Sequence, residues 1–279
     1  MDYKIFAIIV TYNPDNSVLD EFVRKITHQV SKVIIVDNSE PSQVNSYKDV
    51  DIVRLNDNVG IAEAQNIGLQ KAMDENCDFI FTFDQDSQIS DSYCKKMIAE
   101  YNKFKDQYPI ACIGPTINQQ STDHQPKIPR SYLAEKDFII SSGALFPLHA
   151  FQTVGMFKAD WFIDMIDVEW SHRARKKGYL SFETPRVIMN HNIGENEYPK
   201  LFIWEVRIGS LVRQYYLVRN WIFSLKSKSF DMRSKLIIIF LLLKKIPLFA
   251  IMTPKRKRIK FILQGIWDGV IGKGGKYSY

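Results

Sequence analysis

The sequence predicts an α/β protein in which helices cover both faces of a mostly parallel sheet. Three observations indicate this fold class. Short apolar runs rich in β-branched residues alternate with segments of helical spacing, as in repeated strand–helix–strand units. The runs are uniformly apolar, which is typical of strands buried on both faces. Polar turn residues follow the runs, where such strands would end.

The first strand–helix–strand unit begins close to the N-terminus. Residues 4–11 form an apolar run that ends at the turn residues 12–15. Residues 18–30 have apolar side chains at helical spacing, and residues 32–36 are again an apolar run, followed by the polar residues 37–39. We therefore expect a strand, a helix and a second strand in this order.

The same pattern continues to about Pro115. Residues 51–55 predict a third strand, a helix begins near Ile61, and residues 79–83 predict a fourth strand that leads directly into residues 84–86. Ligands of such sheets bind beyond the carboxyl ends of the strands. We therefore expect the polar residues at these ends to form the binding site.

The pattern loosens after Pro115. We expect an irregular polar stretch to about residue 130 and then an apolar segment that contains residues 141–143. A helix is predicted from about Asp167 to Gly178, and a last strand over residues 187–189.

Charge divides the chain into two parts near residue 200. Residues 200–279 hold 17 Lys and Arg against 3 Asp and Glu, whereas residues 1–199 hold 20 against 28, so the parts carry +14 and −8. We expect one domain over residues 1–200 and a helical, basic and apolar region over residues 201–279. Such a region suits an anionic lipid surface or nucleic acid by the same electrostatics, and a solvated helix face is the alternative.

Neither a membrane span nor a disulfide framework is predicted. The longest apolar run, residues 236–243, is shorter than the roughly 20 residues that a spanning helix needs. The N-terminal apolar run is too short for a secretory signal. Cys77, Cys94 and Cys112 lack the paired spacing of zinc or redox sites. We expect a cytoplasmic protein with buried, reduced thiols.

Asp84 and Asp86, directly after the fourth predicted strand, are the most informative pair. Two carboxylates two residues apart in extended chain face the same side and can hold one hard divalent cation. Mg²⁺ held by few carboxylates completes its shell with substrate phosphates. The pair therefore predicts a metal site for a diphosphate ligand, and an exposed polar loop is the alternative.

A second acidic group lies at the start of the helix predicted after residue 166. Asp167 could cap this helix, and Glu169 in its first turn suits the helix dipole. Alternatively, Asp167 is a general base that accepts a proton from an attacking hydroxyl. The residues alone leave both interpretations open.

Taken together, these motifs resemble glycosyltransferase family 2, and within it the bacterial rhamnosyltransferase-like branch. The resemblance spans residues 4 to about 191 and is carried, in order and spacing, by residues 9–13, 35–39 and 58–60, by Asn66 and Gly68, and by residues 83–87 and 167–179. It implies a GT-A type, Rossmann-like catalytic domain that binds a nucleotide sugar. The implied reaction is a metal-dependent, single displacement with inversion at the anomeric carbon.

The resemblance also implies roles for individual residues. Asp167 matches the catalytic base. The implied donor-binding residues are Thr11, Tyr12, Asn13, Asp37, Asn58, Gly60, Asn66, Asp84 and Gln85, with Asp37 at the pyrimidine ring. The implied ligands of Mg²⁺ or Mn²⁺ are Asp84, Asp86 and His191. The acceptor-side candidates are Ser142, Gly143, Asp164, Glu169 and Trp170.

The same resemblance implies the partners. The expected donor is a nucleotide-diphosphate sugar, best dTDP-rhamnose, and the expected acceptor is a saccharide on polyprenyl diphosphate at the inner face of the cell membrane, in cell-surface polysaccharide or O-antigen synthesis. We expect no nucleic-acid partner.

Two alternatives compete with this interpretation. A nucleotidyltransferase usually has a basic glycine-rich loop after its first strand, and residues 11–14 lack one. A non-catalytic basic module that binds nucleic acid or membrane would leave the acidic strand ends of the first 199 residues unexplained.

Overall fold

The computed structural model describes residues 3–118, 133–190, 200–201, 204–205 and 209–278. Within them, the strands are β1 (Ile5–Thr11), β2 (Lys32–Asp37), β3 (Val50–Arg54), β4 (Phe79–Asp84), β5 (Ile110–Asn118), β6 (Ala134–Lys136), β7 (Ala144–Pro147), β8 (Leu180–Asn190), β9 (Lys200–Leu201) and β10 (Trp204–Glu205). The first eight form one sheet in the order β3-β2-β1-β4-β7-β5-β8-β6. β1 to β4 are parallel, as are β5 and β8, whereas β7 and β6 run antiparallel to their neighbours.

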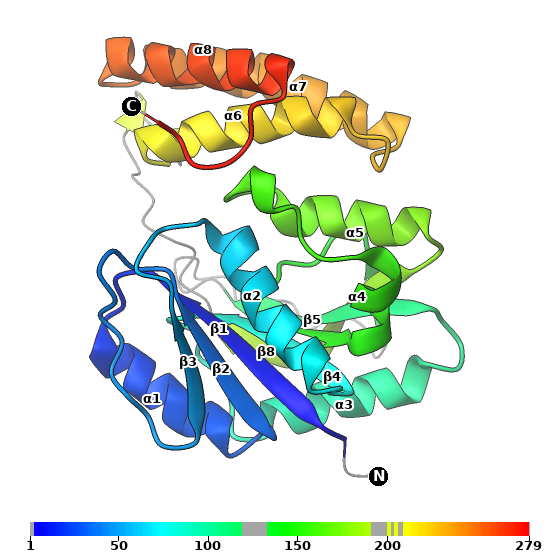
Figure 1. Cartoon of the computed structure of the whole chain (residues 1–279). Helices are drawn as coiled ribbons and strands as arrows, with labels where there is room; N and C mark the ends of the chain where they lie inside the picture. Colours follow the sequence, from blue (N-terminus) through cyan, green and yellow to red (C-terminus); the bar gives the residue numbers. More distant parts are fainter. Residues whose placement is uncertain (1–2, 119–132, 191–199, 202–203, 206–208, 279) are drawn as a thin grey trace.

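Helices cover both faces of this sheet, as predicted. The helices are α1 (Asn16–Thr27), α2 (Ile61–Asp74), α3 (Tyr93–Phe104), α4 (Leu148–Val154), the 3₁₀ helix η1 (Ala159–Trp161), α5 (Ile166–Lys176), α6 (Leu211–Lys226), α7 (Met232–Ile251) and α8 (Lys255–Ile271). Figure 1 shows α1 and α3 on one face of the sheet, and α2, α4 and α5 on the other. The last three helices form a further layer on the side of α5 (Figure 1).

The uniform hydrophobicity of β1 follows from burial on both faces. Phe6, Ile8 and Val10 belong to the core under α2, α4 and α5, whereas Ala7 and Ile9 belong to the core under α1 and α3. Successive side chains of a strand point to opposite faces, so a strand covered on both sides needs apolar residues at every position.

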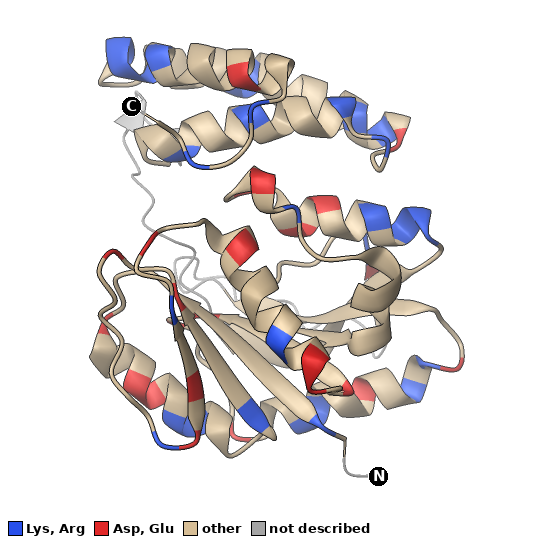
Figure 2. Ribbon diagram, in the orientation of Figure 1, with Lys and Arg blue, Asp and Glu red and all other residues tan. Residues whose placement is uncertain are grey.

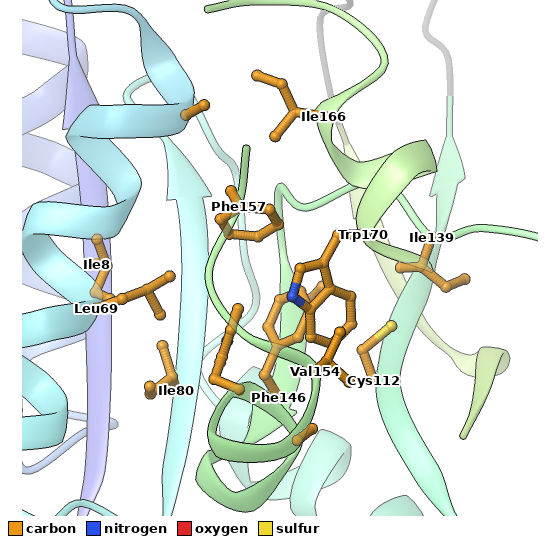
Figure 3. Packing of buried hydrophobic residues seen from close by; sticks show 14 of the residues in the cluster. Ile8, Leu69, Ile80, Cys112, Ile139, Phe146, Val154, Phe157, Ile166 and Trp170 are labelled. Carbon is orange, nitrogen blue, oxygen red and sulfur yellow. The ribbon is translucent and has the colours of Figure 1, made fainter. Parts of the chain in front are cut away.

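An aromatic group fills the core between the sheet and α5. Trp170 is 1% exposed, and its ring contacts those of Phe146, Phe151 and Phe157 at centroid distances of 5.2, 5.0 and 6.0 Å. Figure 3 shows Trp170 above Phe146 and beside Phe157 in this group. The packing fixes α5 against the sheet, and with it the residues at the start of the helix.

The predicted elements before residue 84 agree with the structure to within a few residues. The elements that were not predicted are α3, β5, β6, β7, α4, η1, β9 and β10. β8 is also longer than the strand expected over residues 187–189. The three cysteines are buried and unpaired, as expected, and burial raises the pKa of Cys77 and Cys112 to about 12.

In the part of the chain that the structure describes, every helix is too short or too polar to cross a bilayer.

Candidate active site

A pocket of about 450 Å³ lies at the carboxyl ends of β1 and β4. It is lined by Val10, Thr11, Tyr12, Asn38, Asn58, Gly60, Ile61, Asp84, Gln85, Asp86, Phe162, Ile163 and Arg213. Six of the nine predicted donor-binding residues are among them: Thr11, Tyr12, Asn58, Gly60, Asp84 and Gln85. The strand ends predicted from sequence therefore do meet in one cavity.

A hydrogen bond joins the loops after β1 and β4, which both line this pocket. The backbone N–H of Tyr12, after β1, donates to the side-chain oxygen of Gln85, after β4, at 2.7 Å. Tyr12 itself is 48% exposed. This bond fixes the spacing between the β1 loop and the acidic loop, and leaves the Tyr12 ring accessible at the pocket mouth.

Asp84 and Asp86 are half-buried at the end of β4 and line the pocket together. The Asp84 N–H donates to the hydroxyl of Ser142 at 3.2 Å, and Ser142 also shares a hydrogen bond with Ser87 at 3.2 Å. Two carboxylates beside an open cavity match what Mg²⁺ or Mn²⁺ needs when substrate phosphates supply further oxygens. Among the described residues, no three His, Cys, Asp or Glu side chains form a metal-ligand group.

Asp167 lies beside this acidic loop. Its carboxylate accepts the Ser141 N–H at 3.1 Å and the Val168 N–H at 3.2 Å. Burial raises the pKa of Asp167 to about 6 against the lowering effect of these bonds, and the charge of Asp84 raises it further. Asp167 is therefore mostly ionised at pH 7, with a pKa close to the range of an effective general base.

The Ser141–Gly143 turn holds the two carboxylate groups together. Ser141 accepts the Thr82 hydroxyl on its carbonyl at 2.6 Å, and the Gly143 N–H donates to the Thr82 carbonyl at 2.7 Å. The Gly143 carbonyl in turn accepts the Tyr93 hydroxyl at 2.6 Å. Ser142 and Gly143, expected on the acceptor side, are buried at this junction and position the acidic groups.

Asp37 lies behind the pocket rather than on its lining. Its carboxylate is fully buried and accepts hydrogen bonds from the hydroxyls of Thr11, Ser39 and Ser42. Burial alone would raise the pKa of Asp37, but these bonds outweigh it and hold the pKa below its ordinary value. The structure thus shows Asp37 as the organiser of the loop after β2, with its oxygens engaged inside the protein.

Asn58 and Gly60 form the edge of the pocket at the start of α2. The Asn58 side-chain oxygen accepts the Gly60 N–H and the Asn38 side-chain amide, both at 3.0 Å. Gly60 has a φ of +88°, and a Cβ there would lie 2.6 Å from the Phe162 ring. Only glycine fits both the backbone and the contact.

Asn13 and Asn66, two further donor-binding candidates, have other places in the structure. Asn13 lies outside the lining, where its N–H donates to Ser39 Oγ at 2.8 Å. The Asn66 side chain instead clamps the backbone of Phe157 with two bonds of 3.0 Å.

Glu169 and Trp170 correct the expectation for the acceptor side. Glu169 is 2% exposed and pairs at 3.0 Å with Arg173, which also binds the carbonyls of Val154 and Met156. Trp170 lies in the aromatic core and donates to the Gly155 carbonyl at 2.8 Å. Both residues hold the 154–157 turn against α5. Trp170 is closed off in the core, and Glu169 lines a separate pocket with Lys158 and Phe223 rather than the pocket of Asp84.

Phe162 and Ile163, together with Arg213 of α6, line another part of the pocket. Phe162, Asp164 and Met165 all have φ values near +63°, which is costly for residues with a Cβ. Asn220 of α6 compensates, because its fully buried side-chain amide donates to the carbonyls of Trp161, Ile163 and Asp164 at 2.8–3.0 Å. The C-terminal helices therefore shape the pocket.

Arg213 of α6 is a pocket residue that the sequence interpretation missed. It pairs with Asp164 at 3.0 Å. The nearby charges of Asp164 and, more weakly, of Asp84 in the acidic loop raise the pKa of Arg213. Asp164 is thus engaged with Arg213. The available signal was the helical spacing of Arg213, Tyr216 and Asn220, which puts polar groups on one face of α6. His191 lies outside the described residues.

Comparison with known proteins shows the family of the chain. Residues 6–160 match the family model "Glycosyl transferase family 2". The chain is 29% identical to dTDP-rhamnosyl transferase RfbF of Shigella flexneri over 300 aligned positions that cover 100% of both chains.

Solved structures share the fold at low identity. S. aureus TarS 1–349 in complex with UDP-GlcNAc has a TM-score of 0.61 at 13% identity, over 94% of this chain and 81% of that one. GalNAc-T7 with UDP, GalNAc and Mn²⁺ has a TM-score of 0.56 at 13% identity, over 96% of this chain and 56% of that one. With the sheet order and the pocket described above, these matches identify the chain as a glycosyltransferase with the GT-A fold that belongs to glycosyl transferase family 2.

Proposed function

We propose that the protein transfers L-rhamnose from dTDP-rhamnose to a saccharide hydroxyl, with inversion at the anomeric carbon. The observation that carries this proposal is that Asp84, Asp86 and Arg213 line one pocket, while Asp167 lies near enough to Asp84 for the charge of Asp84 to raise its pKa. The choice of sugar and nucleotide is supported by the full-length similarity to a dTDP-rhamnosyl transferase.

In this proposal, two positively charged groups bind the donor diphosphate: a divalent metal ion and the guanidinium of Arg213. Asp84 and Asp86 would hold Mg²⁺ or Mn²⁺, which, when bound, offsets the charge of the departing diphosphate. Arg213 faces the same space from α6 and is 41% exposed at its side chain. Its guanidinium matches phosphate oxygens in charge and geometry, so we assign it to the diphosphate.

Asp167 is the proposed general base. An acceptor hydroxyl beside it would lose its proton to the carboxylate as the oxygen attacks the anomeric carbon from the side opposite the diphosphate. The Ser141 N–H holds one carboxylate oxygen in place, so the base is oriented before the acceptor arrives. A single displacement needs no covalent enzyme intermediate.

We place the acceptor at a second pocket that shares Arg213 with the first. This pocket, of about 230 Å³, lies between α6 and α7 and is lined in part by Asp164, Gln214, Trp221 and Lys245. Gln214 is 1% exposed, and its amide has no hydrogen-bond partner among the described residues. Buried amide groups need partners, and sugar hydroxyls would supply them. A polyprenyl-diphosphate carrier at the inner face of the membrane would suit Lys245 and the basic helices around it.

The proposal is tested first by donor binding. We expect dTDP-rhamnose with Mn²⁺ to raise the melting temperature, because a ligand that binds only the folded state stabilises it. The melting temperature is compared with that in UDP-GlcNAc, in dTDP-glucose, and in each nucleotide sugar with EDTA. Stabilisation by UDP-GlcNAc but not by dTDP-rhamnose would reject the assigned donor.

Acceptor use is tested by transfer of labelled rhamnose to a polyprenyl-diphosphate saccharide. Gln214→Ala should raise the acceptor KM while the Kd of the donor stays unchanged. Equal loss of donor binding in this variant would place Gln214 outside the acceptor site.

A further inference from the structure

The last two helices turn apolar side chains away from the protein. On α7, Met232, Leu236, Phe240 and Leu243 recur at helical spacing and are between 59% and 71% exposed. On α8, Leu263, Trp267 and Ile271 recur every fourth residue and are between 54% and 61% exposed. We call these seven residues the outer apolar face. A water-soluble surface rarely keeps this many large apolar side chains in regular rows.

The opposite sides of both helices are already used for packing. Ile238 and Phe249 of α7 and Phe261 and Ile262 of α8 are buried against other parts of the protein. The residues of the outer apolar face are therefore not the ones that pack these helices onto the protein, and the fold does not require them to be apolar.

The same two helices also carry exposed basic side chains. Lys255, Arg256, Lys257 and Lys260 are all exposed at the start of α8, and Arg233 and Lys244 are exposed on α7. From residue 232 to 273 the only acidic residue is Asp268, which is buried and accepts the Tyr215 hydroxyl at 2.7 Å. Figure 2 shows the layer of C-terminal helices carrying many basic segments and few acidic ones.

We infer that the outer apolar face docks on the surface of an anionic phospholipid bilayer, with α7 and α8 lying in the interface. Apolar rows bordered by Lys and Arg are what an interfacial helix needs, because the apolar chains enter the acyl boundary while the cations meet lipid phosphates. Trp267 adds an aromatic ring of the kind enriched at this depth.

Charge argues against a second copy of this chain as the occupant. In a symmetric dimer the same patch meets itself, so the basic run of α8 would approach another basic run or lie beside it. The described part of α7 and α8 has no exposed acidic side chain to compensate. Like charges across an interface oppose association, whereas anionic lipid removes the conflict.

The surface and the catalytic pocket share one helix. α6 carries Arg213 into the donor pocket, and α8 packs closely along α6, where the Cβ of an alanine at Gly265 would lie 2.7 Å from the Tyr215 carbonyl. Docking would thus hold the pocket near a lipid-linked acceptor. That consequence rests on the proposed function, whereas the docking itself rests only on α7 and α8.

Vesicle binding by the full chain tests the inference. We expect co-sedimentation with vesicles of phosphatidylcholine and about 30% phosphatidylglycerol, and at least about tenfold weaker binding to phosphatidylcholine alone. Brominated lipids should quench tryptophan fluorescence in the wild type, and Trp267→Phe should remove most of this quenching.

Two surface variants separate the apolar and basic contributions. Leu263→Gln with Trp267→Gln, and Lys255→Gln with Arg256→Gln and Lys257→Gln, should each weaken binding by about tenfold or more. The matched control is Lys95→Gln with Lys96→Gln and Lys105→Gln, which removes the same charge from exposed positions in and just after α3. It should bind like the wild type.

Several outcomes would overturn the inference. They are absence of vesicle binding, equal loss of binding in the control, no effect of the apolar variant, or self-association that the apolar variant abolishes without any vesicle binding. Donor-dependent thermal stabilisation, measured without vesicles, should be the same in all variants. If the donor did not stabilise the wild type, the proposed function would be rejected and the docking result would still stand.

Discussion

Asp84 and Asp167 lie far apart in the sequence but are joined through two adjacent serines. The Asp84 N–H donates to the Ser142 hydroxyl, and the neighbouring Ser141 N–H donates to the Asp167 carboxylate. The charge of Asp84 also contributes to the raised pKa of Asp167. The proposed metal ligand and the proposed base are thus positioned by one turn, and a displacement of that turn would disturb both.

The pH dependence of transfer follows from the pKa of Asp167, which burial raises to about 6. A base must be ionised to accept a proton, so kcat/KM for the acceptor should fall by about tenfold per pH unit below pH 6. Above pH 6 it should reach a plateau until another group titrates. Initial rates measured from about pH 4.5 to about pH 8.5 test for this fall and plateau. A profile that stays flat down to pH 5 would contradict the assignment.

Asp167→Asn should abolish transfer without lowering stability at pH 8. The folded pKa, about 6, lies above the ordinary value of 3.8, so ionisation destabilises the folded state once the pH exceeds both values. Removing the charge should add about 1 kcal/mol at pH 8, after the loss of one accepted hydrogen bond. This gain should disappear below about pH 4. Thermal melts at both pH values measure the difference, and a large loss of stability at pH 8 would refute the reasoning.

Removal of the cation should stop transfer, and Asp86→Asn should weaken its binding. Since Asp86 lines the pocket with Asp84, the variant should need at least about tenfold more Mn²⁺ for half-maximal activity. EDTA should abolish activity, and Mn²⁺ or Mg²⁺ should restore it. Asp91→Asn, at an exposed position after the same strand, is the matched control. Equal metal requirements in both variants would exclude Asp86 as a ligand.

The sequence predicted the part of the site that depends on local pattern. Apolar runs end where polar residues begin, so the local pattern alone assigns Thr11 and Asp84 to strand ends and Asn58 to a helix start. Asp37 also lies at such an end, but its buried hydrogen bonds depend on how the following loop folds back, which spacing does not reveal.

The residues that sequence placed wrongly depend on tertiary packing. Glu169 lies two positions after Asp167, and about 200° of helix rotation turns it to the opposite side of α5. Arg213 belongs to the donor pocket only because α6 packs against residues 160–165, through Asn220 and the buried Arg219. No local pattern near β4 indicates that a distant helix supplies a positively charged side chain to the pocket.

Arg213→Gln should weaken binding of the diphosphate but not of the nucleoside. A charge-assisted hydrogen bond to phosphate contributes about 1.5–3 kcal/mol, so the Kd of the nucleoside diphosphate should rise by about tenfold or more. The Kd of thymidine should be unchanged. Arg175→Gln, which also removes an arginine ion-paired with acidic residues but away from the pocket, serves as the control. Calorimetry with both ligands measures the effect, and an equal loss for thymidine would indicate a general disturbance of the pocket.

Gly60→Ala and Gly178→Ala compare a crowded glycine at the pocket with a glycine in open space. The two glycines have nearly the same φ, +88° and +87°, and Gly60 also has a ψ of 155°, which puts it in a backbone region that is essentially restricted to glycine. A Cβ at Gly178 meets nothing within 4 Å, whereas one at Gly60 lies 2.6 Å from the Phe162 ring and 2.7 Å from the Phe162 carbonyl.

Gly60→Ala should therefore cost at least about 1–3 kcal/mol more than Gly178→Ala in denaturant unfolding, because the backbone of Gly60 disfavours a side chain and Phe162 must move. Phe162 lines the donor pocket, so the same variant should also lose the thermal stabilisation by dTDP-rhamnose, which Gly178→Ala should keep. If both variants lost equal stability and kept donor binding, the close approach of Gly60 to Phe162 would have no part in forming the pocket.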